Sequence, residues 1–282
     1  MTFKLAQSSK ALKKQRRSLL AKYDDEELHQ LRVNLRRVRS ALESTPEKKA
    51  RRLRRDLGRL ARATNSARDW DTLVACARRA LTAAQFGELE PGLDARQAAA
   101  RGQVYRMLGS RRWKTVVRRW KDYSNKAGIQ RQPLADTRQG LEKVVKRSNR
   151  AIRKALVKDD DKHWHQLRIA IKKLRYTLEH MGERGQGPGT AQLIARCKHL
   201  QTELGDWHDT VVHRQLLEEL FEGAGYEAGS AAQAAASALL DALALKRQQC
   251  LSNIKAELRA SSGDQSLASA ELLIAEAAEA GR

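Results

Sequence analysis

The sequence predicts an all-α protein built from two pseudo-symmetric, antiparallel helical bundles that arise from an internal repeat. Only 4 prolines and 17 glycines occur in its 282 residues. No stretch alternates β-branched and polar residues as a half-buried strand does. Apolar residues instead recur at spacings of three and four, which is the period of an amphipathic helix. One such helix also occurs twice, 136 residues apart.

The first copy of the repeated helix is LHQLRVNLRRVRSALE, residues 28–43. Its apolar stripe consists of Leu28, Leu31, Leu35, Val38 and Leu42. A basic stripe lies one residue further on, and it borders the apolar stripe because each residue turns the helix by about 100°. This basic stripe consists of His29, Arg32, Arg36 and Arg39, with Arg37 beside it.

The second copy is WHQLRIAIKKLRYTLE, residues 164–179. Its apolar stripe consists of Trp164, Leu167, Ile171, Leu174 and Leu178. Its basic stripe consists of His165, Arg168, Lys172 and Arg175, and Lys173 matches Arg37. Because both stripes recur, we expect the two copies to line a common basic central cavity or groove.

Capping residues and breaks place the other helices of the first half. They are expected at residues 4–22, 25–44, 46–64, 68–85, 93–109 and 111–125. Asp24 and Asp25 are expected to cap the second helix, and Thr45 with Pro46 to start the third. Gly87 to Gly92 are expected to form a loop.

In the second half, helices are expected at residues 135–157, 164–179, 190–204, 206–223, 228–260 and, as a short terminal helix, 264–280. Asp159, Asp160 and Asp161 are expected to cap the repeated helix, and Gly182 to Gly189 to form a loop. The predicted domains are a first bundle over 1–127, a linker over 128–136, a second bundle over 137–262 and a tail over 263–282.

The charge of the chain predicts a polyanionic partner. It has 55 Lys and Arg against 33 Asp and Glu, a net charge of +22 and a pI near 10.4. From His199 onward there are 6 basic against 13 acidic residues, which leaves +29 on residues 1–198. Such asymmetry is typical of a polyanion-facing part joined to a more neutral part.

Several classes of site are not indicated. Cys76, Cys197 and Cys250 form no C-x-x-C pair, so we expect neither disulfides nor a zinc site, and all three to be small core residues. No secretory signal or run of about 18 apolar residues occurs, which favours a reducing cytoplasm. The glycine-rich loop lacks the Lys-Ser/Thr of a P-loop.

Histidines and acids admit more than one interpretation. His29 and His165 can donate to a phosphate oxygen, or can be anchored by a carboxylate such as Asp69 or Asp209. These two aspartates are expected to be structural residues at helix starts, with acid–base catalysis as the alternative. A metal site would use Asp206, His208, Asp209 and His213, although further ligands are not evident.

His163 is expected to be exposed. Trp113, Trp120, Trp164 and Trp207 are expected in the core.

The sequence resembles the CHAD family, the "conserved histidine α-helical domain". Both copies match its H-x-x-R-x-x-x-[KR]-[KR]-x-R helix, as HQLRVNLRRVR and HQLRIAIKKLR. RDWDTLV, GDWHDTVV and LGSRRWKTVVRRWKDY resemble further segments of that family. The resemblance implies that the whole chain is one CHAD domain, which binds inorganic polyphosphate through a basic central surface. The chain lacks the E-x-E-x-K strand of an added triphosphate-tunnel domain, so the resemblance implies a stand-alone binding module.

Polyphosphate is a flexible string of negative charges, so its receptor needs rows of cations on a rigid scaffold. Helical spacing places such cations about 5–6 Å apart, and the Arg fork can donate to two oxygens. The predicted primary binding residues are His29, Arg32, Arg36, Arg37, Arg39, His165, Arg168, Lys172, Lys173 and Arg175. The second set is Arg51, Arg55, Arg59, Arg62, Lys143, Arg147, Arg150 and Arg153.

We therefore expect a non-enzymatic, cytoplasmic polyphosphate-binding protein, associated with polyphosphate granules, without cofactor or metal. Nucleic-acid binding is an alternative that would respond to salt in the same way. Aromatic residues make up only 5% of the chain, which disfavours binding of single strands by base stacking. An enzyme acting on polyphosphate or nucleotides is the other alternative.

Overall fold

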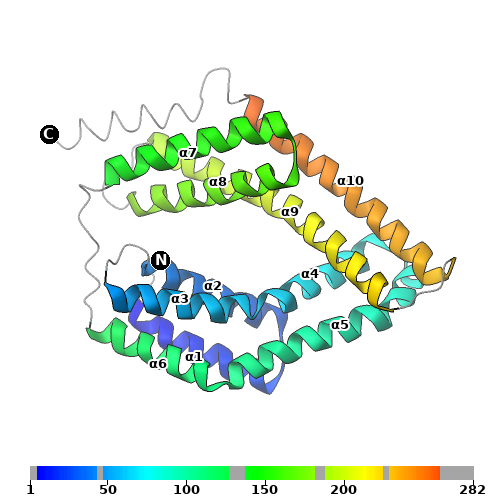
Figure 1. Cartoon of the computed structure of the whole chain (residues 1–282), viewed down its shortest axis with the longest axis horizontal. Helices are drawn as coiled ribbons and strands as arrows, with labels where there is room; N and C mark the ends of the chain where they lie inside the picture. Colours follow the sequence, from blue (N-terminus) through cyan, green and yellow to red (C-terminus); the bar gives the residue numbers. More distant parts are fainter. Residues whose placement is uncertain (1–4, 43–46, 127–136, 182–187, 225–228, 261–282) are drawn as a thin grey trace. The chain divides into compact units, whose positions relative to one another are not determined.

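The chain is helical throughout the residues described in its computed structural model (Figure 1). The described residues are 5–42, 47–126, 137–181, 188–224 and 229–260. No strand occurs within these ranges, and the predicted all-α class is confirmed. No helix among them is long and apolar enough to cross a membrane.

The chain divides into two compact units. The first comprises residues 1–132 and 215–239, and the second comprises residues 133–214 and 240–282. Residues 215–239, which the sequence assigned to the second repeat, therefore pack within the first unit. The predicted linker 128–136, the tail 263–282 and the cap at Thr45 and Pro46 lie outside the described residues.

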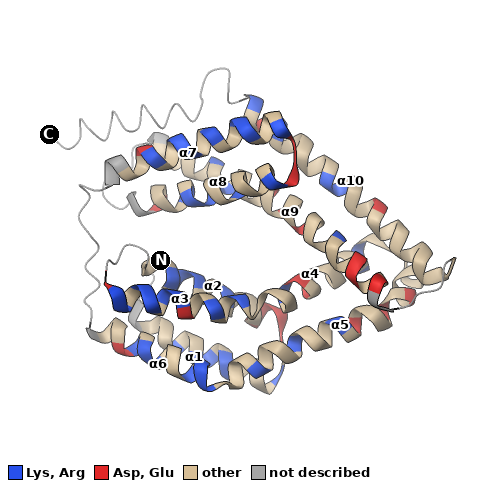
Figure 2. Cartoon of the chain, in the orientation of Figure 1, with Lys and Arg blue, Asp and Glu red and all other residues tan. Residues whose placement is uncertain are grey.

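A four-helix bundle makes up most of the first unit. Each of its helices contacts two others in the order α1, α2, α3, α6 and back to α1. Leu12, Leu35, Leu57 and Trp120 are fully buried between the helices. Lys and Arg residues are spread along α1, α3 and α6 (Figure 2). The helices are α1 (Leu5–Ala21), α2 (Asp25–Ala41), α3 (Lys48–Arg62) and α6 (Arg111–Lys126).

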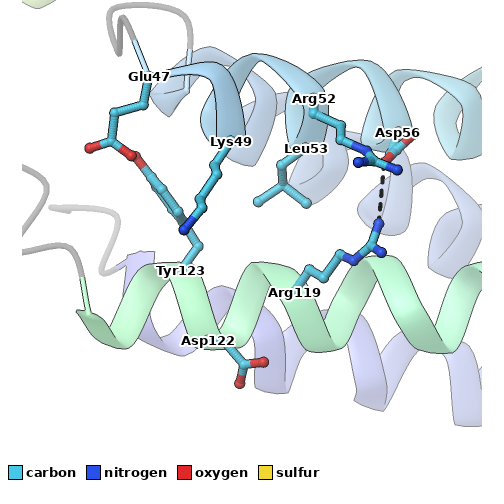
Figure 3. A pocket seen from close by; sticks show the side chains of 8 residues that line it. All are labelled: Glu47, Lys49, Arg52, Leu53, Asp56, Arg119, Asp122 and Tyr123. Carbon is cyan, nitrogen blue, oxygen red and sulfur yellow. Dashed lines mark ion pairs between the residues drawn. The ribbon is translucent and has the colours of Figure 1, made fainter.

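A pocket of about 560 Å³ lies between α3 and α6 (Figure 3). Arg119 Nη1 faces Asp56 Oδ2 across it at 3.9 Å. Its lining includes three cationic and three acidic side chains, so it carries little net charge. The lining residues are Glu47, Lys49, Arg52, Leu53, Asp56, Arg119, Asp122 and Tyr123. This balance does not suit a polyanion.

The rest of the first unit, here named the α4–α5 segment, contains four helical pieces. They are α4 (Asn65–Ala80), α5 (Ala83–Gly109), the part of α9 (Pro188–Ala224) from Gln215 onward, and the part of α10 (Ala231–Ala260) up to Leu239.

The loop predicted at Gly87 to Gly92 is wrong, because α5 continues through it with Pro91 inside. A proline inside a helix costs about 3 kcal/mol. Phe86, Leu89 and Leu93 are buried, and each contributes about 1.5–3 kcal/mol. Their burial on one face of the helix outweighs the proline.

The second unit packs α7 (Thr137–Lys158) and α8 (Asp161–Met181) against α9 up to Arg214 and α10 from Leu240 onward. The sequence predicted separate helices at 190–204 and 206–223, which is wrong, because α9 is one helix of 37 residues. Leu200, Leu204 and Trp207 are buried along one stripe that runs through Gly205. This burial outweighs the cost of about 1 kcal/mol for an interior glycine.

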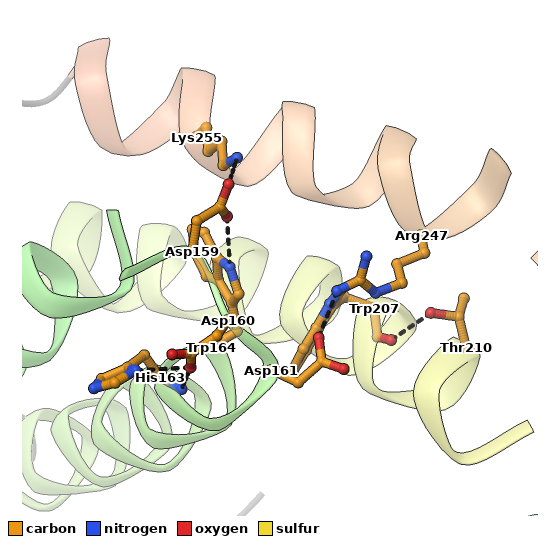
Figure 4. Close-up of polar contacts among 9 residues, drawn as sticks. All are labelled: Asp159, Asp160, Asp161, His163, Trp164, Trp207, Thr210, Arg247 and Lys255. Atoms are coloured by element: carbon orange, nitrogen blue, oxygen red, sulfur yellow. Dashed lines mark hydrogen bonds and ion pairs between the residues drawn. The ribbon is translucent and has the colours of Figure 1, made fainter. Parts of the chain in front are cut away.

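The turn between α7 and α8 uses three aspartates in three ways (Figure 4). Asp160 caps α8 by accepting from the backbone N–H of His163 at 2.8 Å. Asp159 accepts from Lys255 Nζ at 2.6 Å and Trp164 Nε1 at 3.0 Å. The bond from Lys255, more than the other contacts, lowers the pKa of the Asp159 carboxyl.

Asp161 pairs with Arg247 at 2.5 Å. Asp159 and Asp161 were predicted to cap α8, but they bind side chains of α10. In the first unit, the predicted cap Asp24 is confirmed, because it accepts from the N–H of Glu27 at 2.8 Å.

The predicted core tryptophans are confirmed, because Trp113, Trp120, Trp164 and Trp207 are all at most 2% exposed. Cys197 and Cys250 are buried, as expected, whereas Cys76 is half-buried.

Candidate functional site

The basic stripe of α2 faces α3 in the first unit. Arg32 Nη1 donates to Thr64 Oγ1 at 2.8 Å and to Asn65 Oδ1 at 2.9 Å, at the junction of α3 and α4. The Arg39 guanidinium packs over Gly58 of α3, where a Cβ would lie 3.5 Å from its Cζ. The inner arginines of the stripe are therefore held in fixed positions.

The pKa of the Arg32 guanidinium is lowered overall. Burial lowers the pKa of its guanidinium, Asp69 opposes that shift, and the positive charge of Arg36 adds to it. Arg36 and Arg37 are exposed, and His29 is half-buried. Among the described residues no contact between His29 and a carboxylate is recorded. The stripe thus ends in exposed cations at its solvent edge.

Helix α3 places three more cations beside this stripe. Arg51, Arg55 and Arg62 are exposed on its solvent side, whereas Arg59 pairs with Asp56 at 2.9 Å. The structure therefore places residues of two predicted sets on the neighbouring helices α2 and α3. We name this set the α2–α3 basic face, consisting of His29, Arg32, Arg36, Arg39, Arg51, Arg55 and Arg62.

The basic stripe of α8 faces α9 in the second unit. The rings of His165 and His208 lie 5.3 Å apart between centroids. Arg175 Nε lies 3.7 Å from Glu179 Oε1, and its guanidinium lies 4.6 Å from the centre of the Tyr176 ring. Arg168 and Lys172 are half-buried and Lys173 is exposed. These contacts hold the α8 stripe in place.

The environment of His165 disfavours its charged form. His165 is exposed, but partial desolvation lowers the pKa of its imidazole, and the charges of His208 and Arg168 lower it further. Burial would raise the pKa of the Asp209 carboxyl, but a bond from His208 and the charges of His213, His208 and Arg168 lower it overall. The expected carboxylate partner of His165 is not found among the described residues, where its recorded neighbour is His208.

The second predicted set in this unit lies elsewhere. Lys143, Arg147, Arg150 and Arg153 are exposed on α7. Ser148 Oγ of α7 reaches the carbonyl of Ala170 at 3.5 Å, and Ala170 lies on the flank of α8 away from His165. The structure therefore does not bring the α7 cations to the α8 stripe.

Two acids expected at helix starts lie inside helices. Helix α4 begins at Asn65, which places Asp69 in its second turn, and Asp209 lies deep within α9. Neither can cap a helix there. Instead, Asp69 acts electrostatically on Arg32, and Asp209 interacts with Arg168. Both carboxylates thus act on an arginine of the basic stripe in their own unit.

His163 was expected to be exposed, which is wrong. Its side chain is 17% exposed, and Nδ1 lies 2.7 Å from Asp160 Oδ1. The cap at Asp160 holds the ring near the backbone. Within the described residues, no group of three or more His, Cys, Asp or Glu is arranged to hold a metal ion.

Sequence reasoning did not select the cations of α1 and α6. Ten of them are exposed in the first unit: Lys10, Lys13, Lys14, Arg17, Arg111, Arg112, Lys114, Arg118, Arg119 and Lys121. Their helical spacing was visible in the sequence, but nothing in the sequence alone shows that α1 and α6 pack side by side.

Helical units with basic stripes held against neighbouring helices define a class of protein suited to anionic ligands. A family model described as the CHAD domain matches residues 5–218. The chain belongs to the CHAD-domain family.

A solved structure supports the same assignment. The chain is similar to the crystal structure of the CHAD domain from the plant Ricinus communis, with a TM-score of 0.70 and 25% identity. The match covers 91% of this chain and 89% of that one. No curated protein matches the sequence.

Proposed function

We propose that this protein binds inorganic polyphosphate, without chemical change, through the α2–α3 basic face and the basic stripe of α8. The observation that carries the proposal is the anchoring of Arg32 and Arg39 against α3, with Arg36 exposed beside them. Anchored guanidinium groups lose less conformational entropy on binding than free side chains. Arg37, Arg59, Lys173 and the α7 row (Lys143, Arg147, Arg150 and Arg153) add outer contacts in this proposal.

The binding is electrostatic and releases counterions. Affinity for long chains therefore falls steeply as salt rises. Orthophosphate competes poorly, because it can occupy only a small part of a row of cations. In this proposal the histidines donate hydrogen bonds, and His165 does so in its neutral form.

The test is retention of the protein on immobilised long-chain polyphosphate at about 0.15 M salt. Charge reversal by Arg36→Glu with Lys172→Glu is expected to abolish retention. Arg79→Glu with Lys198→Glu is the matched control, because both residues are exposed and outside the proposed faces. Circular dichroism would check that both variants fold. Unchanged retention of the first variant would show that the assigned residues are wrong.

Two further outcomes would favour other functions. Displacement of polyphosphate by duplex or single-stranded nucleic acid at equal phosphate concentration would indicate a nucleic-acid-binding protein. Release of phosphate with Mg²⁺ or Mn²⁺, lost on Asp69→Asn or Asp209→Asn, would indicate an enzyme. We expect neither.

A further inference from the structure

The four-helix bundle is a ring with four seams between adjacent helices. Each adjacent pair is joined by side chains: Gln15 with Asn34 between α1 and α2, Arg39 with Gly58 between α2 and α3, Arg119 with Asp56 between α3 and α6, and Trp120 with Ser8 between α6 and α1. In such a ring, the seam between α1 and α6 lies opposite the α2–α3 basic face.

Helices α1 and α6 run antiparallel along their seam. Trp120 Nε1, near the end of α6, donates to Ser8 Oγ near the start of α1 at 2.8 Å. Arg16 Nε, near the end of α1, donates at 2.8 Å to the carbonyl of Leu108, just before α6 begins. The start of α1 therefore lies beside the end of α6, and the end of α1 lies beside the start of α6.

Cations border this seam from both helices. On α1, Gln15 faces α2, so Lys10, Lys13 and Arg17 fall on the outer side toward α6. On α6, Arg119 and Tyr123 face α3 (Figure 3), so Lys114, Arg118 and Lys121 fall on the other side, toward α1. We name these six cations the α1–α6 basic face.

The α1–α6 basic face carries charge that the fold does not use. All six side chains are exposed, and no ion pair or side-chain hydrogen bond to another described residue is recorded for any of them. The described part of α1 contains no acid, and α6 contains Asp122 alone. Like charges three and four residues apart repel each other. A polyanion would relieve this repulsion.

We propose that the α1–α6 basic face is a second binding face for polyphosphate, so that one protein molecule can hold two separate chains and cross-link them. This inference rests on the proposed function of the α2–α3 basic face. Polyphosphate fits better than single-stranded nucleic acid, because no aromatic side chain of α6 is exposed at this seam to stack on a base: Trp113 and Trp120 are buried and Tyr123 faces α3. Four of its six residues are lysine, which gives weaker, less directional contacts than anchored arginine.

The experiment measures light scattering of the full chain mixed with long-chain polyphosphate at about 0.05 M salt, where weak electrostatic contacts form. The test variant carries Lys13→Gln, Arg17→Gln, Lys114→Gln and Lys121→Gln. Its scattering is expected to fall at least about tenfold, because cross-linking needs both faces. Its retention on immobilised polyphosphate at about 0.15 M salt is expected to stay within about twofold of the wild type.

The control variant carries Arg79→Gln, Lys198→Gln, Lys246→Gln and Arg259→Gln. It has the same net charge, changes only exposed residues outside both faces, and is expected to scatter like the wild type. If the test variant scatters as much as the wild type, or if the control variant loses as much scattering as the test variant, the α1–α6 basic face is not a second binding face. Equal scattering with duplex DNA would overturn its preference for polyphosphate. Absence of wild-type retention would instead overturn the proposed function itself.

Discussion

The four-helix bundle and the α4–α5 segment belong to the same unit but differ sharply in charge (Figure 2). The four helices of the bundle contain 24 Lys and Arg against 5 Asp and Glu. The helices of the α4–α5 segment contain 6 against 8. The positive charge of the first unit is therefore concentrated in the bundle.

The cations of the two regions also differ in what they contact. In the α4–α5 segment, Arg78 pairs with Glu90 at 2.9 Å, Arg101 with Asp71 at 3.1 Å, and Arg96 donates to the carbonyl of Glu219 at 3.3 Å. In the bundle, exposed cations such as Arg36 and Lys13 have no such recorded partner among the described residues. Charge in the segment thus serves folding, whereas excess charge in the bundle opposes it and is available to a ligand.

The largest expected effect lies in the α4–α5 segment, at Asp71. This buried carboxylate accepts from Tyr23 Oη at 2.5 Å, from Gln97 Nε2 at 2.9 Å and from Arg101 Nη2 at 3.1 Å. Burial, and then the bond to Asp71, raises the pKa of the Tyr23 phenol. Asp71→Ala leaves three donors unsatisfied and should lower the free energy of unfolding by about 3 kcal/mol, as measured by urea denaturation.

Asp94→Ala on α5 is the control, because Asp94 is exposed and its loss changes the net charge equally. It should leave stability within about 0.5 kcal/mol of the wild type. Below its melting temperature, Asp71→Ala should still be retained on polyphosphate. Loss of retention in the folded variant would show that the segment contributes to binding, and would break the comparison.

A smaller effect of opposite sign is expected in the two regions when single cations are neutralised. Arg55→Gln on α3 removes repulsion with Arg51 and Arg59 and should raise stability by about 0.2–0.5 kcal/mol at low salt. Arg78→Gln removes the pair with Glu90 and the contact with the Phe86 ring at 4.4 Å. It should lower stability by about 0.5–1 kcal/mol.

Thermal melts at low salt and at about 1 M salt separate these effects, because salt screens exposed charges. The gain from Arg55→Gln should vanish at high salt. Destabilisation by Arg55→Gln at low salt would mean that the bundle's cations support the fold, which would remove the distinction between the regions.

The sequence predicted those features that depend on helical period. The apolar and basic stripes of α2 and α8 follow from spacing alone, and Leu28, Leu35, Trp164 and Ile171 are fully buried as the stripes require. Which flank of each stripe meets which helix depends on packing between distant segments, so the sequence could not show that α3 borders the stripe whereas α7 lies on the other flank of α8.

Helix boundaries were missed where burial outweighs local preference. Gly205 and Pro91 favour breaks, yet the apolar stripes continue through both positions, and that continuity was a usable signal. The prediction that Asp209 lies at a helix start failed for the same reason, because α9 does not break at Gly205. The prediction for Asp69 failed because α4 already begins at Asn65, four residues before it. His163 was missed because its contact depends on which of three consecutive aspartates caps α8.

The smallest expected effect is the dependence of the free energy of unfolding on the protonation of His165, which adds a positive charge to the basic stripe of α8. Partial desolvation, and then His208 and Arg168, lower the pKa of His165 in the folded chain. As pH falls below about 6.5, the usual histidine value, the unfolded chain takes up this proton before the folded chain does. The free energy of unfolding should therefore fall, but only slightly, because His165 is exposed and solvent screens the charges around it.

His165→Gln should flatten this part of the stability profile between about pH 7 and pH 5. His163→Gln is the control, because His163 lies on the same helix but bonds to Asp160. Polyphosphate should reduce the loss of stability in the wild type, since a nearby anion favours the protonated ring. An unchanged profile in His165→Gln would show that an added positive charge on the α8 stripe does not oppose folding.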